Sequence, residues 1–226
     1  MAETTSNARI SILQLILIPS VITLAVTLLR LVGELQHWSE TFFKTSAGGA
    51  GSIIGITWLA PIFGIYFALK LAGAGDGPSS AGRVIGYSVL GLALMFAGLF
   101  VGFGNQVQFP GQAIVGLLII VAAGAILYPA WPALFKTLLA YGYAARIPVA
   151  ILMFFAIRGQ WGTHYDVLPP GFPPETGFWS TYMQIGFLPQ MVLWIVFTII
   201  SGSLFGGIAA AIVHRRKPAE QAANAA

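Results

Sequence analysis

Long apolar stretches, separated by short polar segments, dominate the pattern of the chain. A helix that crosses a hydrocarbon core about 30 Å thick needs roughly 20 consecutive apolar residues. The strands of a membrane barrel would be shorter and would alternate polar with apolar positions, whereas these stretches are continuous. The sequence therefore predicts an all-α integral membrane protein, a six-transmembrane-helix bundle that forms one domain over residues 1–217, followed by a flexible tail over residues 218–226. The expected spans lie near residues 10–32, 53–72, 84–104, 112–134, 137–157 and 190–213.

The composition supports a membrane protein and excludes several other classes. Of the 226 residues, 57% are hydrophobic and only 8% are charged, and the mean hydropathy is +0.83. Soluble domains carry roughly 25% charged residues, so this chain could not cover a water-facing surface. Basic residues are too few for a nucleic-acid-binding patch, and the absence of cysteine excludes thiolate metal sites. We therefore expect the lipid bilayer as a partner, no nucleic acid and no cofactor.

The basic residues predict the orientation of the chain, because cytoplasmic loops carry an excess of lysine and arginine. Six spans place both termini on one side of the membrane. That side would hold Arg9, Lys70, Arg83, Lys136 and the run 215–217, whereas the opposite side would hold Arg30, Lys44 and Arg158. We therefore expect cytoplasmic N- and C-termini in a bacterial-type inner (plasma) membrane.

Two segments on the outer side carry more than loop residues. Residues 33–45 are amphipathic at helical spacing, with Trp38 and Phe42 on one face and Lys44 on the other. This pattern predicts that the first helix continues into an interfacial helix on the outer leaflet. Residues 158–179 are rich in proline, glycine and aromatic side chains, which are uncommon in disordered loops. We expect this second segment to form an ordered cap over the outer end of the bundle.

Two polar features lie within the apolar stretches and are candidates for binding a substrate or a lipid. Arg146, with Tyr143 one turn before it, lies in the middle of the fifth span, where an arginine is costly unless it is paired or hydrated. An interfacial position for Arg146 is the alternative. A polar stripe on the first span includes Arg30 and Glu34, spaced for an ion pair, although stripes of this kind also serve helix packing. The stripe consists of Ser20, Thr23, Thr27, Arg30, Glu34 and His37.

A third pattern raises the hypothesis of a metal site on the outer side. Glu34, His37 and Glu40 are spaced three residues apart, and Glu-x-x-His pairs occur in carboxylate-bridged metal centres. His164 and Asp166 of the outer cap could complete such a shell. Imidazole and carboxylate ligands would suit a divalent transition metal such as zinc, iron or manganese. The alternative is that these charges form the solvated face of an interfacial helix.

The sequence carries no motif that fixes a reaction, and it leaves three functions open. The first is a non-enzymatic membrane subunit or scaffold, which packs against another membrane protein or a second copy through its apolar helix faces and outer aromatic cap. The third and fourth spans contain almost no polar residues, which favours this interpretation. The second is a small transporter or lipid-handling protein that uses Arg146 and the polar stripe. The third is a metal-dependent membrane enzyme that uses the outer Glu/His cluster.

The sequence also predicts close helix packing. Glycine and serine recur at four-residue spacing, which lets two helix backbones approach each other. The pairs are Gly98/Gly102, Gly202/Gly206 and Ser203/Gly207. They predict tight packing of the third and sixth spans, either within the chain or against another copy.

Overall fold

The computed structural model describes residues 11–49, 51–104, 108–173 and 175–224, with side chains up to Val213. Within these residues the fold is helical and contains no strand. The long helices are joined by turns, and a short helix and two π-helical segments form the start of the last rod. The elements are α1 (Ile12–Leu35), η1 (Ala47–Gly49), α2 (Leu59–Gly73), α3 (Ala81–Phe103), α4 (Gln112–Ala125), α5 (Pro132–Gly159), α6 (Phe178–Thr181), η2 (Tyr182–Phe187), η3 (Pro189–Leu193) and α7 (Trp194–Asn224).

Four helices are long and apolar enough to cross a membrane, which is characteristic of a membrane protein. They are α1, α3, α5 and the continuous rod Phe178–Val213. The other two predicted spans contain the shorter helices α2, with 15 residues, and α4, with 14. At 1.5 Å per residue each of these helices is only about 21–23 Å long. They are shorter because α2 begins at Leu59 rather than at residue 53, and because α4 ends at Ala125 before the turn that contains Pro129.

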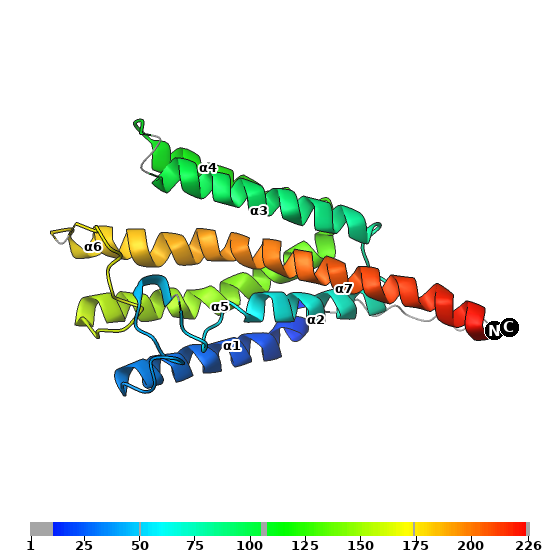
Figure 1. Ribbon diagram of the computed structural model, residues 1–226, viewed down its shortest axis with the longest axis horizontal. Coiled ribbons are helices and arrows are strands. Elements are labelled where there is room, and N and C mark those ends of the chain that lie inside the picture. Colours follow the sequence, from blue (N-terminus) through cyan, green and yellow to red (C-terminus); the bar gives the residue numbers. More distant parts are fainter. Residues whose placement is uncertain (1–10, 50, 105–107, 174, 225–226) are drawn as a thin grey trace.

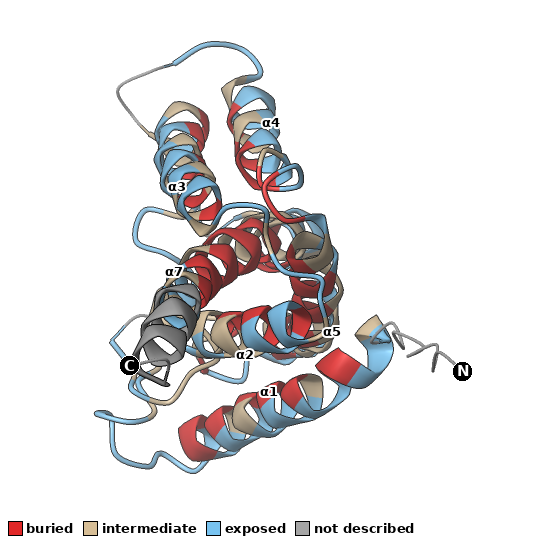
Figure 2. Ribbon diagram, turned by 90° about the vertical axis from the view of Figure 1, so that its right-hand side faces the viewer, coloured by how far each residue is buried: buried red, intermediate tan, exposed pale blue. Residues whose placement is uncertain are grey.

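The rod that ends in α7 lies at the centre of the bundle (Figure 1). It packs against α2, α3, α4 and α5, whereas α1 packs mainly on α5. The helices α3 and α4 form a hairpin on one side of the bundle, and α1 lies on the other (Figure 2). Many apolar side chains of α1 and α3 point away from the protein, since only 28% of the hydrophobic window of each helix is buried. Such faces are suited to contact with lipid.

Small residues bring the helices together as their spacing predicts, and the contacts lie within this chain. Gly202 lies against Gly64, so α7 and α2 approach backbone to backbone. Gly98 and Gly102 of α3 lie against Gly116 of α4 in the same way. Around these contacts the largest fully buried side chains include Tyr141, Phe67, Ile120, Leu134, Leu138 and Ile200.

The two ends of the bundle carry different basic residues. Lys70, Arg83 and Lys136 lie at the end where α2 finishes and where α3 and α5 begin (Figure 1). The loops at this end are joined by hydrogen bonds from Trp131 Nε1 to the Asp76 carbonyl, at 2.7 Å, and from Arg83 Nη2 to the Pro129 carbonyl, at 3.1 Å. Arg30, Lys44 and Arg158 belong to the opposite end, called the distal end below. This grouping is the one on which the predicted orientation depends.

The interfacial helix predicted over residues 33–45 does not form beyond Leu35. The chain reverses there, because His37 adopts a left-handed conformation with φ of 51° and the Trp38 amide bonds back to the Gly33 carbonyl at 2.9 Å. The ring of Phe43 then packs directly on Gly33 and meets Trp38 edge to face, with ring centroids 5.2 Å apart. These aromatic side chains therefore find partners within the protein, which an interfacial helix would not provide.

Helix α7 continues to Asn224 and so covers most of residues 218–226. The flexibility expected for this C-terminal segment stays a prediction. Residues 225 and 226 lie outside the described residues, as do Ile10, the first residue of the predicted first span, and Arg9.

Candidate functional site

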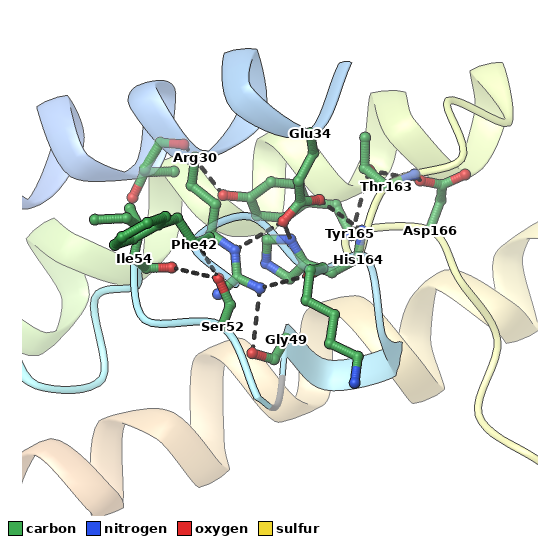
Figure 3. A network of polar contacts seen from close by, with 12 residues as sticks. Arg30, Glu34, Phe42, Gly49, Ser52, Ile54, Thr163, His164, Tyr165 and Asp166 are labelled. Carbon is green, nitrogen blue, oxygen red and sulfur yellow. Dashed lines mark hydrogen bonds and ion pairs between the residues drawn. The ribbon is translucent and has the colours of Figure 1, made fainter. Parts of the chain in front are cut away.

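A pocket of about 320 Å³ lies at the distal end, between α1, α5 and the π-helical segments. Two long loops complete it, one between α1 and α2 and the other between α5 and α6. It is lined by Arg30 and Arg146, by His164 and Gln190, and by apolar side chains such as Val149. No aspartate or glutamate side chain among the described residues lines this pocket. We call it the distal pocket. Arg30, His164 and Tyr165 of its lining belong to the network of polar contacts in Figure 3.

Glu34 is the centre of that network. Its side chain is fully buried, and it accepts hydrogen bonds from Arg30 Nε at 2.8 Å and from the His164 backbone amide at 2.8 Å. The third contact joins Glu34 Oε1 to His164 Nδ1 at 2.6 Å. This carboxylate therefore ties α1 to the loop after α5, two segments that are far apart in the sequence (Figure 3).

Arg30 ties α1 to a second loop, the one between α1 and α2. Its Nη2 donates to the carbonyls of Lys44 and Gly49, both at 3.1 Å. Gly49 has φ of +75°, and a Cβ atom built on it would lie 2.9–3.0 Å from Arg30 and His164. Both the backbone conformation and the close approach therefore require glycine at this position.

The loop between α5 and α6 is held in place by its own turn and by buried tyrosine. Asp166 accepts from the amides of Gly162 and Thr163, at 2.9 and 2.8 Å, and from the Thr163 hydroxyl at 2.6 Å. The Tyr165 hydroxyl donates to the Thr27 carbonyl at 3.2 Å, and the Tyr165 side chain is buried. The turn therefore presents His164 and Tyr165 to the bundle, and Asp166 serves the turn.

Burial sets the protonation of the two residues that the loop brings in. The pKa of His164 is lowered from its usual 6.5, mainly by burial and further by the Arg30 cation, although Glu34 opposes the change. The net change in the pKa is downward, so the imidazole is neutral at pH 7. Neutral His164 then donates from Nδ1 to Glu34, which leaves Nε2 as an acceptor. Burial likewise raises the pKa of Tyr165, so its hydroxyl stays protonated.

Arg146 forms the opposite wall of the pocket and is only 5% exposed. Its Nη1 donates to Gln190 Oε1 at 3.3 Å, and its guanidinium carbon lies 4.5 Å from the centre of the Trp194 ring. Within the part of the chain that the structure describes, no carboxylate lies within 4.0 Å of this guanidinium. Arg146 is therefore a buried cation whose charge has no acidic partner there. Its depth in a membrane, central or interfacial, stays a prediction.

Proline explains how two partners of Arg146 reach it from the last rod. Pro189 has no backbone N–H to donate, so an α-helical bond is missing where the rod passes the pocket. The backbone is π-helical on both sides of Leu188, in η2 and η3. A π-helical turn shifts the angular position of the residues that follow, and such turns are frequent at functional sites. Gln190 and Trp194, which sequence reasoning missed, line the pocket from this segment.

The predicted site residues are thus divided among several places. Arg30 and Arg146 line the distal pocket, and Glu34 lies behind Arg30 and pairs with it. Tyr143 does not, because it is 40% exposed and lines a smaller apolar cavity between α4, α5 and α7.

The predicted metal ligands are dispersed as well. His37 and Glu40 are exposed on the turn after α1, and only Glu34 and His164 are in contact. The described residues contain no group of three or more histidine, aspartate or glutamate side chains that could hold a metal ion. Arg30 instead occupies the position beside Glu34 that a cation would take.

Comparisons with known proteins add no further constraint. A scan against protein-family models, a search of curated proteins and a search of solved structures find no match to this chain. The fold is a helical bundle with four helices long and apolar enough to span a bilayer, which is the pattern of a membrane protein. A proposal of function therefore depends on the distal pocket and the residues that line it.

Proposed function

We propose that the protein is a small transporter or lipid-handling protein of a bacterial-type inner membrane, and that its distal pocket binds an anionic ligand. One observation carries the proposal: the guanidinium of Arg146 is buried, borders the pocket and has no acidic partner among the described residues. An arginine in this position costs several kcal/mol unless something compensates its charge. A bound anion would supply that compensation.

The charges around the pocket support the same conclusion. Arg30 is neutralised by Glu34, which lies behind it and does not line the pocket, whereas Arg146 has no carboxylate partner among the described side chains. Neutral His164 adds no charge. The pocket therefore carries a net charge of about +1 by this count, and its apolar walls keep the local dielectric low, so the charge acts strongly on a ligand.

Binding of anions tests this proposal directly. We expect the purified protein in nanodiscs to bind small anions, and Arg146→Gln to weaken the binding by about 10- to 100-fold, the value of a charge-assisted hydrogen bond of 1.5–3 kcal/mol. Isothermal titration calorimetry would measure the affinity. Lys136→Gln is the matched control, because it removes a positive charge from α5 at the other end of the bundle. Equal affinities for both variants would exclude Arg146 as the binding residue.

The proposed topology has six membrane crossings: the four long helices, together with the shorter helices α2 and α4. Residues 53–58 before α2 and residues 126–131 after α4 are mostly apolar and would lengthen the passage of these two helices. The distal end then faces away from the cytoplasm, as the distribution of basic residues predicts. The alternative role as a subunit or scaffold stays a prediction from the apolar faces of the bundle.

Cysteine labelling tests the orientation, and the chain offers a clean background because it has no cysteine. A cysteine at Ser79, in the loop between α2 and α3, is expected to react only with reagents that enter the cytoplasm. A cysteine at Thr45, in the loop between α1 and α2, is expected to react with impermeant maleimide added to intact cells. The reverse pattern would invert the topology.

A further inference from the structure

The distal pocket has features that define its ligand beyond a negative charge, if it binds an anion as proposed above. The first is the arrangement of its free donors. Arg146 uses only Nη1 in a protein hydrogen bond, and Arg30 uses Nε and Nη2, so each guanidinium keeps donors without a protein acceptor among the described residues. These donors come from α5 and α1. A ligand held by both needs oxygen atoms that point in different directions.

The second feature is the limited charge. One unneutralised arginine is complementary to a ligand with a single negative charge. A phosphate monoester or free phosphate carries about −1.5 to −2 at neutral pH, whereas a phosphodiester carries −1. A carboxylate is also a monoanion, but its two oxygens lie in one plane and suit a single guanidinium. The tetrahedral oxygens of a phosphodiester suit two guanidinium groups on different walls.

The third feature is the apolar surface beside the cations. Val149 and Met153 follow Arg146 on the same face of α5, toward the distal end, and Ile56 faces them from the loop before α2. All three line the pocket, and Val149 and Met153 are almost fully buried within the protein. A small inorganic anion would make little contact with these side chains, whereas the ester groups of a ligand would pack against the parts that border the pocket.

We infer that the distal pocket binds a phosphodiester with apolar ester groups, the chemistry found at the headgroup of a phospholipid. Arg146 and Arg30 contact the two free phosphate oxygens. Val149, Met153 and Ile56 contact the ester groups. The volume of about 320 Å³ admits the phosphodiester and short ester groups, and is at the lower end of the range for small-molecule sites.

A series of soluble dialkyl phosphates tests this assignment. Dimethyl, diethyl and dibutyl phosphate have the same single charge and differ only in their apolar groups. We expect the affinity, measured calorimetrically in nanodiscs of zwitterionic lipid, to rise by about fourfold for each methylene that the pocket buries. The same titrations with Arg146→Gln measure how much of the signal comes from partition of the dialkyl phosphates into the bilayer. Ile56→Thr, at a partly exposed loop position, should flatten the series while dimethyl phosphate still binds.

The outcomes separate this inference from the proposed function. Failure of every anion to bind would overturn both. Binding of phosphate or hexanoate as tightly as dibutyl phosphate would overturn the phosphodiester assignment and keep an anion site, and an affinity that ignores chain length would do the same. The series rising as expected supports the assignment. Competition by phosphatidylglycerol in the nanodisc would then identify a membrane lipid as the source of the diester. If phosphatidylglycerol does not compete, the natural ligand is a soluble diester.

Discussion

Replacing Glu34 with alanine is expected to lower the free energy of unfolding by about 3–5 kcal/mol, the cost of leaving a buried charge without its partner. Three hydrogen bonds to Glu34 are lost, from Arg30 Nε, from the His164 amide and from His164 Nδ1. Arg30, which is only 7% exposed, then has lost the carboxylate that neutralises its charge. The effect reaches beyond α1, because Glu34 and Arg30 together hold both long distal loops.

Chemical unfolding in mild detergent, followed by circular dichroism, would measure the change. Glu40→Ala is the matched control, because it removes the same side chain from an exposed position on the turn after α1. Glu34→Gln keeps an acceptor oxygen for Arg30 and should fall between alanine and the original protein. A loss below about 1 kcal/mol for Glu34→Ala, the range of an exposed ion pair, would show that water reaches Glu34.

The polar stripe on α1 is the part of the site that the sequence predicts best. Its side chains recur every three to four residues, so a helix must place them on one side, and lipid disfavours that side. Thr23, Thr27, Arg30 and Glu34 are buried, whereas Ser20 is partly exposed and His37 is exposed beyond the end of α1. The hydroxyls of Thr23 and Tyr141 lie 2.7 Å apart, and this contact ties α1 to α5. Local periodicity was sufficient for these four residues because one helix carries them all.

The partners of the stripe could not be predicted, because they depend on distant segments. His164 reaches Glu34 from a position 130 residues later in the chain, through a loop whose path follows from the turn at Asp166. The metal hypothesis depended on helix continuing past Leu35, and the reversal at His37 removed the regular spacing. For Gln190 a signal was present: an amide directly after a proline, at the start of the predicted sixth span. That Gln190 would line the pocket could not be predicted, because its direction depends on the π-helical backbone around Pro189.

The contact between α2 and α7 predicts the second large effect, at Gly64. A Cβ atom at this position would lie 2.3 Å from the Gly202 Cα and 2.5 Å from the Gly202 carbonyl oxygen. Backbone atoms cannot move aside as a flexible side chain can, so Gly64→Ala must separate α2 from the central rod. We expect a loss of about 3 kcal/mol or more in the free energy of unfolding, at the upper end of the cost of overpacking.

Gly86→Ala is the matched control for Gly64→Ala, because it makes the same change in the middle of a helix. No atom lies within 4 Å of a Cβ built on Gly86, which is exposed on α3. Alanine there should be neutral or should stabilise the protein by up to about 1 kcal/mol, since glycine is the weaker helix former. Unfolding in the same detergent gives both values. Equal effects at the two positions would mean that helix propensity, rather than the approach of α2 to α7, explains why position 64 is glycine.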